Sequence, residues 1–281
     1  MSDDVLAALG ECCHQLRKLD VTLSLNFTDE GIRKVCEGCP KLEELVIDQC
    51  SKLTNESLVH LGHHSAMLKY ISATSIANIT DQGVGALLPG CQQLQTLRLP
   101  MCSLSGQSAY HIAEYGADIL YLDVRGAKLE DDHLCEIVNA LKKLQTLNLG
   151  LCFELTDASV KEIALHCKDI KHLFLVNNKI TDEGLLHLSV YSQDIVHLDV
   201  SWCHGVTADG ARKVLNGCPK LKHLGLFRCD KVPDSAVSEL CSQFPQVFIS
   251  TLETEMKKSR CQKLDGKREK SGVEKLSVSS S

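Results

Sequence analysis

Cysteine and histidine are the residue types in this sequence that could perform chemistry. The chain contains 15 cysteines and 12 histidines. Cys36 and Cys39 have the spacing of half a zinc site, and His172, His197 and His223 recur at intervals of 25 and 26 residues. Thiolates and imidazoles are the usual protein ligands of transition metals, and a row of imidazoles can also respond to pH. A metal site, a pH-sensitive element and a packing role are the three interpretations to separate.

The positions of the cysteines favour packing. Ten of the 15 occupy only two places of a repeated unit. They are Cys13, Cys39, Cys91, Cys167 and Cys218 at the first place, and Cys50, Cys102, Cys152, Cys203 and Cys229 at the twelfth. Free cysteine behaves as a small buried hydrophobe, and no second CxxC or matched histidine pair completes a zinc site. We therefore interpret the cysteines as structural and expect no metal and no cofactor.

The elements that carry these residues follow a repeat of 25 or 26 residues. Its most regular apolar position is occupied by Leu16, Leu42, Leu68, Leu94, Ile119, Leu144, Ile170, Ile195, Leu221 and Val247. Self-similarity at this period is typical of a leucine-rich repeat solenoid. The seventh and ninth places, such as Leu45 and Ile47, point the same way along an extended chain and should enter the core.

Threonine followed by aspartate or asparagine precedes the helical part of many units. The clearest pairs are Thr54-Asn55, Thr80-Asp81, Thr156-Asp157 and Thr181-Asp182. A short oxygen-bearing side chain at this point accepts hydrogen bonds from the free amides of a helix start. The unit is thus predicted to be strand, turn and helix. The fold class is α/β, a right-handed α/β horseshoe with a parallel sheet on the concave face and helices on the convex face.

Three segments are expected. Residues 1–12 would be the remnant of an N-terminal cap, one helical turn that directs Val5, Leu6 and Leu9 inward. Residues 13–250 would form about nine repeats and a terminal strand. Residues 251–281 are rich in lysine, arginine and serine, a composition typical of a short helix at most, followed by disorder.

No enzymatic motif is present, so we expect a protein that is not an enzyme. The three histidines share the sixth place of successive units and would stack on strands about 4.8 Å apart. We interpret them as a polar ladder, with a metal-dependent enzyme as the minor alternative. The net charge of −6 argues against nucleic acid as a partner. Neither a membrane span nor a basic signal sequence is evident, so we expect a cytoplasmic location, with the nucleus as a second compartment.

Large side chains at the outward places of the predicted sheet indicate a protein-binding surface. The candidate residues on the concave face are Tyr70, Arg98, Met101, Tyr121, Asp123, Arg125, Phe174, Val176, Asp199, Trp202, Phe227 and Arg228. Aromatic residues and arginine dominate the binding energy of protein interfaces. The alternative is that Phe174, Trp202 and Phe227 cover one another or lie beneath the C-terminal tail.

Cysteine at the first and twelfth places, followed by (I/L)TD, resembles the cysteine-containing repeats of F-box/LRR-repeat proteins, which are substrate receptors of Skp1–cullin–F-box ubiquitin ligases. The resemblance is strongest in KITDEGLLHLSVYSQDIVHLDVSWC (179–203), LKHLGLFRCDKV (221–232) and FPQVFISTL (244–252). It implies a receptor in ubiquitin-dependent degradation that binds its substrate with the concave face and with a helix from Thr251 to about Leu264. One family member with such closing repeats engages wrongly paired BTB-domain proteins.

The chain departs from that family at its N-terminus. In the family an F-box precedes the repeats, whereas only residues 1–12 stand before the first unit here. We therefore expect contact with the Skp1–cullin machinery only in a longer form that carries an F-box. The alternative function is a free-standing intracellular interaction scaffold with no link to a ligase.

Overall fold

Ten strands and ten helices alternate along the part of the chain that the computed structural model describes, residues 1–251. The strands are β1 (Lys18–Asp20), β2 (Glu44–Val46), β3 (Tyr70–Ser72), β4 (Thr96–Arg98), β5 (Tyr121–Asp123), β6 (Thr146–Asn148), β7 (His172–Phe174), β8 (His197–Asp199), β9 (His223–Gly225) and β10 (Phe248–Ser250). The predicted basic tail and the helix expected to begin at Thr251 fall on residues 252–281, outside the described residues.

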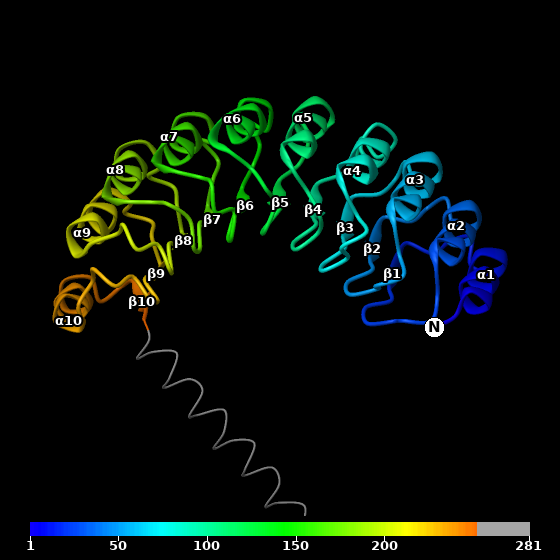
Figure 1. Cartoon of the computed structure of the whole chain (residues 1–281), viewed down its shortest axis with the longest axis horizontal. Helices are drawn as coiled ribbons and strands as arrows, with labels where there is room; N and C mark the ends of the chain where they lie inside the picture. Colours follow the sequence, from blue (N-terminus) through cyan, green and yellow to red (C-terminus); the bar gives the residue numbers. More distant parts are fainter. Residues whose placement is uncertain (252–281) are drawn as a thin grey trace, which may run out of the picture.

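The helices lie on one side of the sheet. They are α1 (Asp3–Cys12), α2 (Asp29–Gly38), α3 (Asn55–His64), α4 (Asp81–Leu87), α5 (Gly106–Tyr115), α6 (Asp131–Ala140), α7 (Asp157–His166), α8 (Asp182–Tyr191), α9 (Ala208–Gly217) and α10 (Asp234–Gln243). The strands pair in parallel and in sequence order, from β1 to β10. Figure 1 shows the resulting arc, with the helices on its outer, convex side and the strands on its inner, concave side. The predicted leucine-rich repeat solenoid is confirmed.

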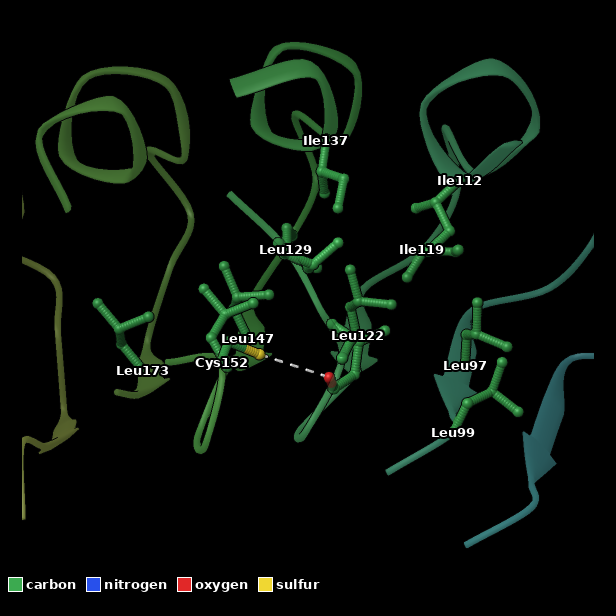
Figure 2. Close-up of a cluster of buried hydrophobic side chains, with 14 of the residues drawn as sticks. Leu97, Leu99, Ile112, Ile119, Leu122, Leu129, Ile137, Leu147, Cys152 and Leu173 are labelled. Carbon is green, nitrogen blue, oxygen red and sulfur yellow. Dashed lines mark hydrogen bonds between the residues drawn. The ribbon is translucent and has the colours of Figure 1, made fainter. Parts of the chain in front are cut away.

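The core is a thin layer of aliphatic side chains between the sheet and the helices. The central residue of each strand from β2 to β9 points into this layer, and the ninth place of each unit follows it, as Leu45 and Ile47 do in the second unit. Figure 2 shows the middle of the layer, where Leu122 and Leu147 face Ile137 of α6. Such a layer needs residues of similar size at every turn, because each unit packs only against its neighbours.

The twelfth-place cysteines pack in this layer and also satisfy the backbone. The Sγ atom of Cys152 donates to the carbonyl of Val124 at 3.6 Å, a bond drawn in Figure 2. Cys102 and Cys203 make the same bond to the carbonyl oxygens of Ala73 and Leu175, at 2.9 and 3.2 Å. Burial raises the pKa of Cys152 to about 12, so its thiol stays protonated at neutral pH. These side chains therefore serve packing, as predicted, and also bond the backbone, which was not predicted.

The Thr–Asp pairs do more than begin a helix. The Oγ1 atoms of Thr54, Thr156 and Thr181 accept the amide two residues further on, which confirms these helix starts. Thr80 is an exception, because its Oγ1 accepts from Asn55 Nδ2 of the preceding unit instead. The aspartate at the first position of the helix, which follows threonine in four units, Ser2 in α1 and Glu130 in α6, bonds forward to the next unit. Its carboxylate accepts from the next helix start in the pairs Asp3–Thr28, Asp29–Thr54, Asp81–Ser105, Asp131–Thr156, Asp157–Thr181 and Asp182–Thr207.

The N-terminal helix covers the first unit more fully than predicted. Helix α1 has ten residues rather than a single turn, and its Leu6 is buried against α2. Leu9 is half-buried and packs on the core. The inward orientation predicted for Val5 is wrong, since 48% of its surface is exposed. Asp3 fastens this helix to the first unit, because its carboxylate accepts from the amide and the hydroxyl of Thr28 at the start of α2.

One position of the turn after each strand from β1 to β9 has a left-handed backbone. At the eleventh place, φ is between 57° and 63° for Leu23, Gln49, Ser75, Met101, Leu151, Asn177, Trp202 and Arg228, and Gly126 has φ 81°. This conformation costs a residue with a Cβ roughly 1–2 kcal/mol. It persists because it aims the amide at the next unit, as in the bond from Trp202 N to the Phe227 carbonyl at 2.7 Å. The side chain of the eleventh residue is turned outward as a result.

No helix within residues 1–251 combines the length and the apolar character needed to cross a membrane.

Candidate protein-binding surface

The candidate residues form two groups on the concave side of the arc. The strand register places Tyr70 and Tyr121 on either side of Thr96, and Arg98 directly beside Asp123. Tyr70, Arg98, Tyr121, Asp123 and Arg125 are called the central arginine cluster. Phe174, His197, His223, Trp202, Phe227 and Arg228 are called the C-terminal aromatic cluster. Six of the predicted residues lie in the turns after the strands rather than on the strands: Met101, Arg125, Val176, Trp202, Phe227 and Arg228.

Arg98 organises the central arginine cluster. Its terminal NH1 donates to the hydroxyl of Tyr70 at 3.1 Å, and its guanidinium carbon lies 5.9 Å from the centre of the Tyr121 ring. The guanidinium is therefore held between two tyrosines in a hydrogen bond and a cation–π contact. Large amphipathic side chains held in fixed positions lose little entropy when a partner binds.

Asp123 supports the arginines from beneath. Only 1% of its surface is exposed, so the sequence interpretation of Asp123 as a partner contact needs correction. Its Oδ2 lies 3.9 Å from Arg98 Nε and 3.7 Å from an Arg125 terminal nitrogen, and its Oδ1 accepts the Arg125 amide. Burial raises the pKa of Asp123, and the two arginines oppose that rise. The alternating strand pattern placed Asp123 outward correctly, but the longer arginine side chains cover it.

The histidine ladder occupies the first residues of β7, β8 and β9, at the opposite end of these strands from Trp202 and Phe227. The ring centres of His172 and His197 are 6.2 Å apart, those of His197 and His223 are 4.1 Å apart, and Phe174 lies 4.7 Å from His197. Burial, followed by the charges of the neighbouring histidines, lowers the pKa of His197 to about 4. His197 is thus neutral at physiological pH. Stacked rings do not converge on one point, and no group of metal-ligating side chains suited to an ion occurs among residues 1–251.

Trp202 and Phe227 form the other part of the C-terminal aromatic cluster, in the turns after β8 and β9. Their ring centres are 5.8 Å apart, and the guanidinium carbon of Arg228 lies 5.7 Å from the Trp202 ring. The two aromatic rings partly cover one another, as the alternative interpretation held, yet Trp202 stays 40% exposed. Tryptophan and arginine presented together on an open surface are typical of the centre of a protein interface.

The other predicted residues lie at the margins of the two clusters. Met101 is 50% exposed at the left-handed turn beside Gly126. Val176 is half-buried, and Asp199 accepts the amide of Ser201 at 2.9 Å, so its carboxylate helps to form the turn before Trp202.

Two aromatic residues on this side of the molecule were missed by the sequence interpretation. Phe248 packs edge-on against His223 with ring centres 5.1 Å apart and extends the ladder onto β10. Phe153 stands 55% exposed beside a recess in the turn between β7 and α8. Counted from Val247, Phe248 is the fifth residue of the last unit, yet it pairs with the sixth-place His223 in the strand register, so the repeat count alone did not reveal it. The signal for the recess was the length of the turns.

Comparison with known proteins agrees with the repeat architecture. Residues 166–189 and 191–215 match a family model described as leucine-rich repeat. F-box/LRR-repeat protein 4 of Bos taurus is 28% identical over 183 residues, which are 60% of this chain and 28% of that protein. Coronatine-insensitive protein homolog 2 of Oryza sativa is 28% identical over 204 residues, which are 66% of this chain and 34% of that protein. The chain therefore spans about a third of the length of these curated relatives.

A solved structure supports the fold. A chain in the crystal structure of the Rad7 and Elc1 complex from yeast superimposes with a TM-score of 0.54 at 17% identity, over 88% of this chain and 81% of that chain. Together these matches identify the molecule as a leucine-rich repeat array related to F-box/LRR-repeat proteins and to coronatine-insensitive protein homologues. Repeats of this kind are typically binding domains without catalysis.

Proposed function

We propose that this repeat array is the substrate-recognition part of a Skp1–cullin–F-box ubiquitin ligase and captures another protein on its concave face. The observation that carries the proposal is the exposure of ordered arginine and aromatic side chains along that face, in the central arginine cluster and the C-terminal aromatic cluster. Sheets of this curvature present a long surface without a closed, water-excluding pocket, which suits an extended protein partner better than a small substrate.

The chemistry of both clusters fits a protein partner. Arg98 and Arg228 each lie against aromatic rings, and such planar groups supply a large contact area at a low cost in side-chain entropy. The buried Nε atoms of Arg98 and Arg125 make no hydrogen bond within residues 1–251. A carboxylate or carbonyl of the partner would instead meet the terminal guanidinium nitrogens, because the side chains of Arg98 and Arg125 are 31% and 40% exposed.

The ligase role is supported by the kinship with F-box/LRR-repeat proteins. In this proposal the Skp1–cullin machinery is recruited by an F-box in a longer form of the protein. The closing repeats resemble those of F-box/LRR-repeat protein 17, from which we propose BTB-domain proteins as the substrate class. The proposed location is the cytoplasm and the nucleus, where the ligase machinery acts.

Affinity capture from cells followed by quantitative mass spectrometry tests the concave-face proposal. The test variant is Arg98→Glu combined with Trp202→Ala, and the matched control is Gln107→Ala on the convex helix α5, where Gln107 is exposed. The proposal requires a set of proteins that the wild type and the control retain and the concave variant loses. Identical sets from all three would refute it.

The ligase link needs a separate readout. An F-box-containing longer form should capture Skp1 and cullin together with the concave-face partners, and inhibition of the proteasome should raise the amount of those partners. Capture of the same partners with no Skp1, cullin or ubiquitin in the complex would identify a free-standing scaffold instead.

A further inference from the structure

A recess opens at the turn between β7 and α8, beside the C-terminal aromatic cluster. It has a volume of about 410 Å³ and is lined by Phe153, residues 177–181, Trp202, His204 and Gly205. Phe153 belongs to the sixth unit and Trp202 to the eighth, so two exposed aromatic residues from alternate units flank a floor made by the seventh.

The recess results from a difference in turn length. The step from the twelfth place to the helix-starting threonine is four residues in the units on either side, from Cys152 to Thr156 and from Cys203 to Thr207. In the seventh unit, the step from Asn178 to Thr181 is only three residues. The backbone still pairs across these turns, through bridges from Thr156 to Lys179 and from Thr181 to Gly205. The shorter turn thus stands between two longer ones, and residues of all three units line the recess.

A polar atom beneath the recess lacks a partner. Asn178 takes the place of the twelfth-place cysteine and is 94% buried, since only 6% of its surface is exposed. Its Nδ2 donates to the carbonyl of Leu149 at 3.0 Å, as a thiol does in the neighbouring units. Its Oδ1 is buried and accepts no hydrogen bond within residues 1–251. An unmet buried acceptor is costly, and a ligand that supplies a donor would remove that cost.

Lys179 and His204, the ionisable side chains that line the recess, already have carboxylate partners within the chain. Lys179 Nζ lies 2.6 Å from Glu154 Oε2, and His204 Nδ1 lies 2.8 Å from Asp230 Oδ2. A charged occupant would have to displace one of these pairs. Charge complementarity therefore favours an uncharged side chain, and the aromatic walls favour a flat one.

We propose that the recess receives a tryptophan or tyrosine side chain of the captured protein, with the indole N–H or phenol O–H donated to Asn178 Oδ1. The proposal rests on the proposed function and adds an anchor next to the concave face. The occupant's ring lies between Phe153 and Trp202, and the donor reaches the floor of the recess after a small adjustment of the side chains that now cover Oδ1.

Small probes test the recess without knowledge of the partner. Indole and N-methylindole have nearly the same shape, but only indole carries the donor. Titration of the whole chain with each probe, followed by NMR of the backbone amides of residues 177–181, should show saturable binding of indole. N-methylindole should bind about five- to tenfold more weakly, as expected for the loss of one hydrogen bond to a buried acceptor.

Two variants make the test specific. Asn178→Cys restores the residue found at the twelfth place in Cys152 and Cys203, whose thiols bond the equivalent carbonyl, so the fold is kept while the acceptor is lost. In this variant the preference for indole over N-methylindole should disappear. Insertion of one glutamate after Lys179 gives the seventh unit the turn length of its neighbours, fills the recess and should abolish binding of both probes.

The outcomes separate this inference from the proposed function. Equal binding of the two probes by the wild type, or indole binding that survives the insertion, would overturn the proposal that the recess binds a ring through a hydrogen bond to Asn178 Oδ1. Neither result bears on capture through the central arginine cluster, which the Arg98→Glu change of the concave-face experiment tests, whereas Trp202 takes part in both surfaces. Indole binding with the stated preference, together with weaker partner capture by the insertion variant, is the result that the proposal predicts.

Discussion

The carboxylate of Asp131 accepts both the backbone amide and the hydroxyl of Thr156, which lies one unit further along the chain. The distances are 2.9 Å to the amide and 2.7 Å to Oγ1. Burial alone would raise the pKa of Asp131, but hydrogen bonds from Ser159 and Thr156 outweigh it and lower the pKa. Six such links join successive helices at the same place of the repeat, so the aspartate at the first position of a helix fastens one unit to the next.

Replacement of this aspartate should loosen the array at one junction. Asp131→Ala leaves the partly buried Thr156 amide without an acceptor, and the free energy of unfolding should fall by about 1–3 kcal/mol. Asp131→Asn is the matched control. Asn55, at the corresponding helix start of the second unit, already accepts the amide of Thr80 in the third unit. Urea denaturation monitored by circular dichroism measures the free energy of unfolding of both variants. An asparagine variant as unstable as the alanine variant would contradict the hydrogen-bond account.

The left-handed turn residues predict opposite effects of two glycine changes. Ser75 is exposed and has φ 57°, so Ser75→Gly should raise the free energy of unfolding by about 0.5–1 kcal/mol through relief of backbone strain. Gly126→Ala should lower it, because φ is 81° and a Cβ would lie 2.8 Å from Met101 Sδ. Thermal denaturation of the two variants decides the matter, and a destabilised Ser75→Gly would show that the strain is not relieved.

The concave aromatic residues should be dispensable for folding. Trp202→Ala combined with Phe227→Ala removes surface contacts only, so partner capture should weaken while the helical and sheet signal of circular dichroism is unchanged. Leu147→Ala is the internal reference, because Leu147 is fully buried and its truncation should cost about 2–5 kcal/mol. If the double variant unfolds at the temperature of Leu147→Ala, then both rings belong to the core.

The histidine ladder predicts a pH dependence of stability. The pKa of His197 in the folded chain is about 4, below its ordinary value of 6.5, because of burial and the facing His223 and His172, against which Asp199 acts in the opposite direction. Protonation therefore favours the unfolded chain. The free energy of unfolding should keep its full value above about pH 6.5. It should fall by about 1–2 kcal/mol as the pH is lowered toward 4, once solvent screening is allowed for.

His197→Phe is the control for that dependence. Phenylalanine keeps a ring next to Phe174 and has no proton to gain, so the decline between pH 6.5 and 4 should become smaller in this variant. Urea midpoints measured across that range give the comparison. An unchanged slope would assign the acid sensitivity to other groups.

The fold could be predicted from the sequence because every unit repeats the same pattern of apolar and helix-starting residues. Leu45 and its equivalents are buried at one period, and Thr54 and its equivalents begin helices at the same period, so local pattern and overall architecture agree. The forward bonds of Asp131 and its equivalents escaped prediction because they join residues 24 or 25 positions apart. Rules for helix capping consider only the residues of one helix.

The site was predicted less completely than the fold. Alternation along a strand identifies which way Arg98 and Asp123 point, but it does not reveal that the longer side chain covers the shorter one. It also does not reveal that Trp202 leaves the strand and takes a left-handed turn, because no glycine marks that position. The recess beside Phe153 depends on a one-residue difference between neighbouring turns, which only an alignment of the units against one another exposes.

Site-specific photo-crosslinking in cells tests most directly whether the concave face is where another protein binds. A photoreactive phenylalanine analogue would be placed at Tyr70, at Phe174 and, as the convex control, at Gln107, and the crosslinked proteins identified by mass spectrometry. The two concave positions should capture one shared protein that the convex position does not, and Arg98→Glu should abolish that product. A crosslinked protein at the convex position, with none at either concave position, would contradict the account.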